Sequence, residues 1–255
     1  MGISSPIKIS VVTVTWNCVD TISDCLDSVA TQSWVNFEHV AIDGASTDGT
    51  VVVLEARRDA IAVLVSEQDK GIYDALNKGI ERATGEVVGF LHADDIYADE
   101  GVLADVAAAF EDPAVQAVYG DLQYVQKQNT NRVVRYWRSA QFTPGRLATG
   151  WMPAHPTLYV RREWYQRIGG FDTRYRIAAD YFSILQMFSQ PDFRSVYLPR
   201  VMVKMRLGGE SNRSLKNIIR KSREDLDALR RSGVGGIRAL VWKNLSKVTQ
   251  FLGNR

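Results

Sequence analysis

Two adjacent carboxylates, Asp94 and Asp95, follow a short apolar run and are the residues of this chain best suited to chemistry. The run spans residues 86–91, and its length and composition are typical of an interior strand of a parallel sheet. Open α/β sheets bind ligands at the carboxyl ends of their strands. Two neighbouring carboxylates repel each other unless a cation lies beside them. The pair therefore indicates either a divalent metal that carries a phosphorylated ligand or an Asp-Asp turn that only caps the next helix.

Two further carboxylates follow other apolar runs. Asp43 comes directly after residues 40–42, and Asp69 follows residues 61–65. Because the carboxyl ends of parallel strands meet at one edge of a sheet, we expect these acids to lie near the Asp94-Asp95 pair. Carboxylates can accept hydrogen bonds from the N–H of a nucleobase and from ribose hydroxyls, and a metal can neutralise a diphosphate.

Glycine-rich nucleotide motifs do not accompany these acids. The first predicted strand is not followed by Gly-x-Gly-x-x-Gly, which disfavours a dinucleotide fold of the dehydrogenase type. The chain has no Walker loop, which disfavours ATP hydrolysis. A ligand held by carboxylates rather than by glycine amides implies a different recognition scheme.

Strands and helices alternate in the first half of the chain. Runs of β-branched and apolar residues predict strands over residues 7–15, 40–42, 61–65 and 86–91. Helical spacing predicts helices over residues 20–31, from a cap at Ser46 or Asp48 to about residue 59, and 71–83. The inner face of the third helix is expected to contain Ile72, Ala75, Leu76 and Ile80. This order predicts an α/β fold with a mostly parallel central sheet, right-handed crossovers and flanking helices.

The pattern changes after Asp95. We predict helices over residues 101–110, 162–168 and 178–189, and a strand over 115–119. A hairpin is predicted from strands at 122–126 and 133–137, with its turn at 129–131. No Pro/Ser-rich linker or repeat separates the halves, so the second half is expected to pack onto the first as an acceptor-side lobe.

Charge is distributed unevenly along an otherwise ordinary composition. Of 255 residues, 45% are hydrophobic and 24% are charged, which is usual for a globular protein. Residues 213–255 contain 11 Lys/Arg against 3 Asp/Glu, whereas the whole chain has a net charge of only +2. The two cysteines match no metal spacing, and the chain shows neither a signal peptide nor an apolar run of about 18 residues. We therefore expect a cytoplasmic protein with reduced cysteines.

Several motifs, in a consistent order over about residues 7–212, resemble family 2 glycosyltransferases. They are residues 9–17, residues 42–50, the acids after residue 91, residues 169–172 with 178–181, and residues 207–211. Residues 67–79 match a subgroup of the colanic-acid type from bacterial polysaccharide gene clusters. This family has the GT-A fold and transfers sugars from nucleotide-diphosphate donors with inversion. The chain departs from the family pattern at Gly44, where a second Asp usually stands.

The resemblance implies roles for matched residues. The nucleotide sugar would be bound by Thr13, Thr15, Asn17, Asp43, Asp69, Lys78 and Asp94. Asp95 would bind Mg²⁺ or Mn²⁺, hard cations that suit carboxylate and phosphate oxygens. Asp180 would be the general base that takes the proton of the acceptor hydroxyl, although it could instead be only a helix N-cap, worth ~1 kcal/mol.

Other residues at matched positions have two interpretations. His92 stands where many relatives have the first acid of an Asp-x-Asp motif, and it either approaches the metal or packs at the strand end. His155 lies in a segment near the expected acceptor cleft, where a lone histidine is more often structural. Lys78 either contacts phosphates or faces solvent on its helix.

The basic segment at residues 213–255 is predicted as a helical tail that follows a glycosyltransferase domain at 1–212. Residues 214–231 and 237–252 read as two helices, and the second has an apolar stripe beside cationic residues. Such a helix can lie on the inner face of an anionic plasma membrane. Packing against the catalytic body or a second protomer of a homo-oligomer is the alternative. No motif supports nucleic-acid binding.

The leading hypothesis is a metal-dependent inverting glycosyltransferase. Its partners would be a nucleotide-diphosphate sugar donor and a saccharide acceptor, which this subgroup commonly uses in polyprenyl-linked form. The reaction would belong to the synthesis of bacterial surface polysaccharide. A sugar-phosphate nucleotidyltransferase is an alternative, but that class usually has a Gly-rich loop after its first strand, where this chain has Trp16-Asn17-Cys18. A non-catalytic nucleotide-binding scaffold is the third hypothesis, which the retained acids disfavour.

Overall fold

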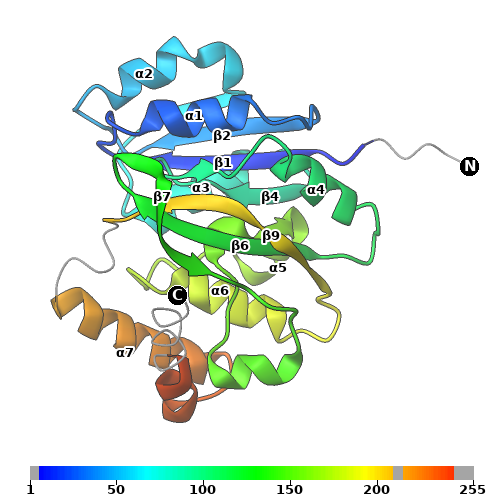
Figure 1. Cartoon of the computed structure of the whole chain (residues 1–255). Coiled ribbons are helices and arrows are strands. Elements are labelled where there is room, and N and C mark those ends of the chain that lie inside the picture. Colours follow the sequence, from blue (N-terminus) through cyan, green and yellow to red (C-terminus); the bar gives the residue numbers. More distant parts are fainter. Residues whose placement is uncertain (1–5, 209–214, 244–255) are drawn as a thin grey trace, which may run out of the picture.

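One mixed sheet forms the centre of the molecule (Figure 1). The computed structural model of the protein describes residues 6–208 and 215–243. Within these ranges nine strands form the sheet, in the order β3-β2-β1-β4-β8-β6-β9-β5, with β7 paired to β6. The strands are β1 (Ile9–Thr15), β2 (Phe37–Asp43), β3 (Val63–Ser66), β4 (Val87–Phe90), β5 (Ile96–Tyr97), β6 (Ala117–Gln126), β7 (Asn129–Trp137), β8 (Tyr159–Arg161) and β9 (Ser195–Arg206).

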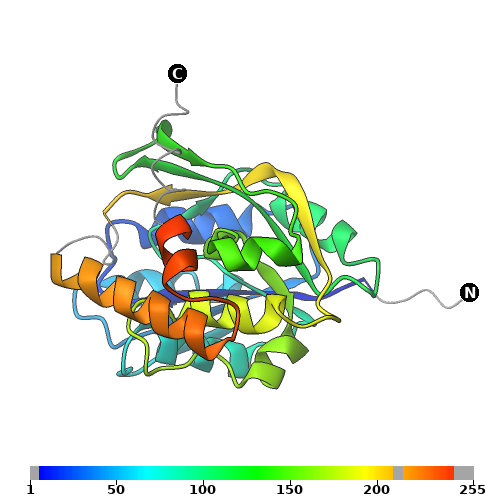
Figure 2. The same cartoon turned by 90° about the horizontal axis from the view of Figure 1, so that it is seen from below.

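The helices lie on both sides of this sheet (Figures 1 and 2). They are α1 (Ile22–Ala30), α2 (Thr50–Ala56), α3 (Ile72–Arg82), α4 (Val102–Ala109), α5 (Arg162–Ile168), α6 (Ala179–Phe188) and α7 (Leu215–Arg231). Short 3₁₀ turns occur at Arg58–Ala60, Pro144–Thr149 and His155–Thr157. The expected α/β fold with a mostly parallel sheet and flanking helices is confirmed.

The first four strands, β1 to β4, are parallel and end at the same edge of the sheet. β1 pairs with β2 and β4, and β2 pairs with β3. The register places Thr15 opposite Asp43 and Asp43 opposite Ser66. Three polar side chains from three strands therefore meet where β1, β2 and β3 end, and Asp43 is the predicted acid among them.

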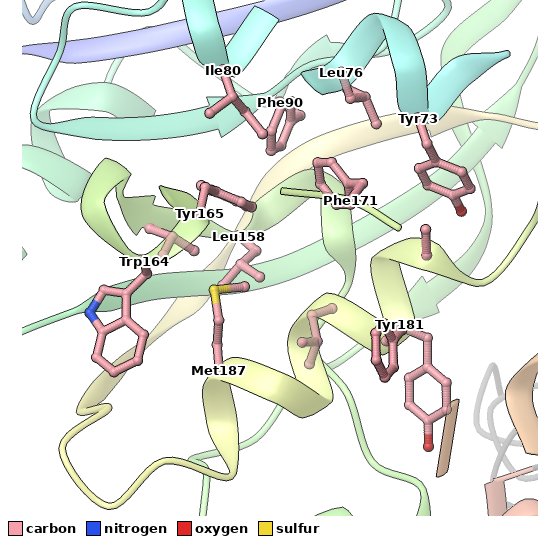
Figure 3. Packing of buried hydrophobic residues seen from close by; sticks show 14 of the residues in the cluster. Tyr73, Leu76, Ile80, Phe90, Leu158, Trp164, Tyr165, Phe171, Tyr181 and Met187 are labelled. Carbon is pink, nitrogen blue, oxygen red and sulfur yellow. The ribbon is translucent and has the colours of Figure 1, made fainter. Parts of the chain in front are cut away.

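Side chains alternate between two hydrophobic cores because successive residues of a strand point to opposite faces. Ile9 and Val11 of β1 pack with α1, α2 and α4, whereas Val12 and Val14 pack with α3, α5 and α6. Figure 3 shows the second core, in which Phe90 of β4 lies near Phe171 and Tyr165. The first residues of α6 pack in this core against side chains of the sheet.

Several details differ from the sequence predictions. The strands predicted at 115–119 and 122–126 are one continuous strand, β6. β6 and β7 form one hairpin whose turn is Lys127-Gln128, not residues 129–131. Ile72 is 46% exposed because α3 begins there, before the helix packs on the sheet, whereas the other three predicted inner-face residues of that helix are buried. The twelve-residue strand β9 and the short strand β5, which pairs with it, were not predicted.

The described part of the C-terminal segment packs on the body, with α7 alongside α6 (Figure 2). A buried ion pair joins Asp225 of α7 to Lys243, at 2.9 Å between Oδ1 and Nζ. Lys243 Nζ also lies 3.1 Å from the ring centroid of Tyr181 in α6. The predicted second tail helix is described only over residues 237–243, and the rest of it lies outside the described residues. No helix in the described ranges combines the length and apolar character that a bilayer crossing requires.

Candidate active site

Asp43 is the centre of a compact polar pocket at the sheet edge. Its side chain is fully buried, and its two oxygens accept four hydrogen bonds. The donors are the hydroxyls of Thr15 at 2.8 Å, Ser46 at 2.5 Å and Ser66 at 2.7 Å, and the Ser46 backbone N–H at 2.9 Å. Burial opposes ionisation of Asp43, but these hydrogen bonds outweigh it and lower the pKa of the carboxyl. We call Asp43 with these three donor residues, Thr15, Ser46 and Ser66, the base pocket.

Two strained residues shape the loops beside the base pocket. Asn17 and Ala45 have positive φ angles, of 48° and 59°, in a region that L residues rarely adopt. Asn17 joins the loops, because its Oδ1 accepts the N–H of Thr47 at 2.9 Å and its own N–H donates to Ser46 Oγ at 2.8 Å. Backbone strain of this kind is frequent at ligand sites, where the surrounding structure holds it.

Asp69 fills the space that the missing acid of the family motif would need. A Cβ atom added at Gly44 would lie 2.5 Å from Asp69 Oδ2 and 3.5 Å from Trp16 Cδ1. Any side chain at position 44 would therefore displace the Asp69 carboxylate, which the N–H of Gly71 holds at 2.8 Å. The structure thus gives a physical reason for glycine at this position and brings Asp69 next to the base pocket.

Trp16 also lies in this region, although it was not among the site residues predicted from the sequence. It lies between the end of β1 and Asn17, and 69% of its surface is exposed. An indole ring that is exposed beside a buried carboxylate is suited to stack on a planar base. The signal in the sequence was an aromatic residue directly after a buried strand, but exposure cannot be read from that pattern.

Two of the predicted nucleotide-sugar ligands lie elsewhere. Thr13 is completely buried, and its hydroxyl is 2.9 Å from His39 Nε2. Lys78 Nζ pairs with Glu67 at 2.8 Å and donates to the Gln68 carbonyl at 3.1 Å, which fastens α3 to the loop before it. Neither side chain joins the base pocket in this structure.

Asp94 and Asp95 have different surroundings. Asp95 is fully buried, with Oδ1 accepting the N–H of Arg206 at 3.2 Å and Oδ2 without a hydrogen-bond partner. Burial, and then the charge of Asp94, raise the pKa of Asp95 well above its usual range. Asp94 is partly exposed, and within the described ranges no group donates to its carboxylate. Asp94 is therefore the acid of the pair that solvent or a ligand can reach.

Arg206 fixes the backbone that carries this pair. Its side chain is 5% exposed, and Nη1 donates to the Asp94 carbonyl at 3.1 Å. Nε donates to the Lys127 carbonyl at 3.0 Å, and Nη2 pairs with Asp24 of α1. Because Arg206 is the last residue of β9 and Asp95 directly precedes β5, the pairing of these two strands brings them together.

His92, His155 and Asp180 lie close to one another and near Asp94. The rings of His92 and His155 have centroids 6.1 Å apart, and His155 stacks on Phe90 at 5.4 Å. Burial lowers the pKa of His92, whereas the charges of Asp94 and Asp180 raise it by a smaller amount. Both carboxylates therefore lie near His92. We call His92, Asp94, Asp95, His155 and Asp180 the acid cluster.

Asp180 stands in the first turn of α6, where the sequence placed it. Its Oδ1 is 3.2 Å from the hydroxyl of Tyr73, which also lies 2.6 Å from the Ile177 carbonyl oxygen. The residue that precedes the helix is Ala178, and Asp180 makes no capping hydrogen bond there. The alternative prediction, that Asp180 is only the N-cap of this helix, is therefore wrong.

The acid cluster offers few ligands to a divalent cation. Among the described residues, no three His, Cys, Asp or Glu side chains converge as a complete metal site. The partly exposed Asp94 carboxylate offers one hard oxygen ligand, which fits Mg²⁺ or Mn²⁺ if diphosphate oxygens supply most of the others. His92 has no carboxylate to add, so the chain contributes fewer oxygens here than an Asp-x-Asp motif would.

Comparisons with known proteins agree with this geometry. A family profile described as glycosyl transferase family 2 matches residues 10–179. The PGL/p-HBAD biosynthesis glycosyltransferase of Mycobacterium bovis (strain BCG / Pasteur 1173P2) is 33% identical over 208 residues, which cover 80% of this chain and 78% of that protein.

Two solved structures are similar in fold. The mannosyltransferase PcManGT from Pyrobaculum calidifontis, in complex with GDP-Man and Mn²⁺, matches with a TM-score of 0.67 and 21% identity, over 99% of this chain and 77% of that one. S. aureus TarS 1–349 in complex with UDP-GlcNAc matches with a TM-score of 0.68 and 20% identity, over 89% of this chain and 66% of that one.

A GT-A-like sheet with a carboxylate pocket and an acid pair at its strand ends defines a glycosyltransferase that uses a nucleotide-sugar donor. The matched length of the family profile and the identity to the mycobacterial protein then settle the family. The chain belongs to glycosyl transferase family 2.

Proposed function

We propose that this protein is a divalent-metal-dependent, inverting glycosyltransferase that transfers a sugar from a nucleoside-diphosphate donor to a hydroxyl of a saccharide acceptor. The observation that carries this proposal is that Asp94 and the Tyr73-bound Asp180 both lie near enough to His92 for their charges to act on its ring, so two carboxylates share one site. One carboxylate would serve the donor and the other the acceptor in a single displacement.

In this proposal the base pocket binds the nucleoside. Asp43 is held as an anion by its hydrogen bonds and accepts an N–H of the base, and Trp16 stacks on the ring. Asn17 and Asp69 complete the surrounding loops. Because the carboxylate is already fixed, little ordering is needed when the nucleotide binds.

Asp94, rather than Asp95, would hold the metal. The sequence assigned the metal to Asp95, and that assignment stays a prediction, but the burial of Asp95 supports the reverse order. A bound Mg²⁺ or Mn²⁺ would supply electrostatic stabilisation of the departing nucleoside diphosphate. Asp95 and Arg206 would then keep the Asp94 backbone in place.

Asp180 would act as the general base. The acceptor oxygen forms a bond to the anomeric carbon while the bond from that carbon to the diphosphate oxygen breaks, and the hydroxyl proton passes to Asp180. Attack opposite the leaving group inverts the anomeric carbon. Tyr73 fixes the Asp180 carboxylate through its hydroxyl at 3.2 Å.

The acceptor in this proposal is a lipid-linked saccharide of a bacterial surface polysaccharide pathway, met at the inner face of the membrane. The subgroup motif at residues 67–79 and the basic composition of residues 213–255 support this finer statement. Co-sedimentation with vesicles that contain anionic lipid tests the membrane contact. Equal sedimentation with neutral and anionic vesicles would contradict it.

A donor panel tests the core of the proposal. UDP-, GDP- and dTDP-sugars are incubated with Mn²⁺ or Mg²⁺ and a saccharide acceptor, and nucleoside diphosphate release is measured. We expect release from one nucleotide class, dependent on metal and acceptor, and thermal stabilisation by the matching diphosphate. Release of pyrophosphate from a nucleoside triphosphate and a sugar phosphate would instead indicate a nucleotidyltransferase. Binding of the diphosphate without turnover of any donor would indicate a scaffold.

A further inference from the structure

The helix that carries Asp180 is preceded by three backbone amides that no local side chain satisfies. α6 starts at Ala179, its N-cap is Ala178, and that residue provides no side-chain acceptor. Local caps such as Ser, Thr, Asp or Asn usually supply one near the start of a helix. The amides of Arg176, Ile177 and Ala178 instead point to one carboxylate from a distant part of the chain.

That carboxylate is Glu224 of α7. Its Oε1 accepts the N–H of Arg176 at 3.2 Å, and its Oε2 accepts those of Ile177 at 2.8 Å and Ala178 at 3.0 Å. Hydrogen bonds from amides to an ionised carboxylate are stronger than those between neutral groups. A single side chain, 46 residues from Ala178, therefore fixes three consecutive peptide units directly before the helix.

Further contacts tie the same segment to α7 and to α3. Asp227 accepts the hydroxyl of Tyr175 at 2.5 Å, and Arg231 donates to Asp172 at 3.0 Å. From the opposite direction, the hydroxyl of Tyr73 lies 2.6 Å from the carbonyl oxygen of Ile177. Ile177 is thus held at its N–H by Glu224 and at its C=O by Tyr73, three residues before Asp180.

We infer that Glu224 is a positioning residue for Asp180, so that α7 completes the catalytic geometry. This inference rests on the proposed role of Asp180 as the base. A general base must stand within hydrogen-bond reach of the proton it takes. A misplacement of 1 Å can reduce a rate about 100-fold. Glu224 does not contact Asp180; it sets the backbone from which Asp180 projects.

The test compares Glu224→Ala and Glu224→Gln with Asp227→Asn, which removes a charge from the same helix one turn further on. We expect Glu224→Ala to lower kcat about 10- to 100-fold, with the donor Kd within about two-fold of the unchanged protein. Glu224→Gln keeps one acceptor oxygen and is expected to recover part of that loss. Asp227→Asn keeps an oxygen that can accept the Tyr175 hydroxyl, so it is expected to keep kcat within about two-fold.

Hydrogen exchange of the amides at 176–178 provides a readout that does not depend on activity. These amides are expected to exchange faster in Glu224→Ala and to be unchanged in Asp227→Asn. If Glu224→Ala does not fold, Glu224→Gln is measured alone. Turnover within two-fold of the unchanged protein in the folded Glu224 variant would overturn the inference, whatever the exchange result.

The failure of this inference differs from a failure of the proposed function. If Asp180→Asn abolishes turnover and the Glu224 variants do not reduce it, only the positioning role is wrong. If Asp180→Asn retains turnover, the base assignment fails, and faster exchange at 176–178 would then report a contact without a catalytic consequence.

Discussion

The base pocket and the acid cluster lie at the same edge of one sheet, yet they treat charge in opposite ways. In the base pocket, the buried carboxylate of Asp43 has four donors at 2.5–2.9 Å. In the acid cluster, Asp95 Oδ2 and His155 Nε2 are buried without partners. The pKa of Asp43 is lowered, whereas that of Asp95 is raised.

This difference separates recognition from chemistry. A carboxylate that four donors hold stays ionised and keeps its position before the nucleotide binds, and a nucleobase N–H can then take the place of one of its hydroxyl donors. Polar groups that lack partners inside a protein raise the free energy of the folded state until a ligand or cation satisfies them. The acid cluster therefore has the properties of a region completed by its substrates, and the base pocket has those of a region complete before they arrive.

The largest effect is expected for the acid cluster at Asp180. Asp180→Asn keeps the size of the side chain and removes its ability to take a proton, so kcat should fall about 10²- to 10⁴-fold. Donor affinity, measured by calorimetry with the diphosphate and metal, should stay within about two-fold because the base pocket is untouched. Turnover close to that of the unchanged protein would remove Asp180 from the proposed mechanism.

A pH experiment uses the unpaired histidine of the acid cluster. Burial lowers the pKa of His155 to about 4, below the value of about 6.5 in an unfolded chain. Between pH 6.5 and 4 the unfolded state binds the extra proton, so His155 makes stability fall on acidification, by up to about 3 kcal/mol at pH 4. His155→Phe keeps a ring beside Phe90 and should remove this share of the pH dependence, measured by urea unfolding at each pH.

His39 is the matched control for that experiment. It is buried against Thr13 of β1, away from His155, and burial lowers its pKa to about 4 as well. The slope of stability against pH should therefore persist in His155→Phe at about the share that His39 and His92 contribute. An unchanged slope in His155→Phe would mean that His155 takes up its proton in the folded protein.

Within the acid pair, the two aspartates should respond differently. Asp94→Asn should weaken metal-dependent donor binding about 10- to 100-fold, because it removes the reachable carboxylate. Asp95→Asn leaves a side chain that can still accept the Arg206 N–H, and donor affinity should change about three-fold or less. Titration of the diphosphate in the presence of Mn²⁺ distinguishes them, and the reverse ranking would return the metal to Asp95.

The smallest effect is expected at Lys78. Its side chain is 22% exposed and its ammonium is paired with Glu67, and ion pairs of this kind contribute about 0–1 kcal/mol. Lys78→Met should change the KM for the donor about two-fold or less. A ten-fold increase would show that Lys78 leaves Glu67 for a phosphate and joins the base pocket in function.

The sequence predicted the parallel half of the fold because its rules are local there. Runs of β-branched residues, helical spacing and acids after apolar runs each extend over fewer than about 20 residues. Thr15, Asp43 and Asp69 were placed correctly at one sheet edge for this reason. Thr13 was not, because it lies two residues before the end of β1, where its side chain contacts His39 inside the protein instead of the pocket at the sheet edge.

The distinction between Asp94 and Asp95 could not be predicted because it depends on β9. That strand contains Pro199 and several charged residues, which weaken a strand pattern, yet it pairs along β6 and delivers Arg206 to the acid pair. Contacts between residues far apart in the chain leave no local signature. The link from Glu224 to Ala178 is invisible for the same reason.

The position of Glu224 in the chain has a consequence for synthesis. Once a ribosome has translated residues 1–212, the nascent chain contains every residue of the base pocket and the acid cluster. Glu224, whose carboxylate orders residues 176–178, has not yet been added. Nascent chains could therefore acquire affinity for the nucleotide before they acquire a correctly placed base, and transfer would begin only once α7 has docked.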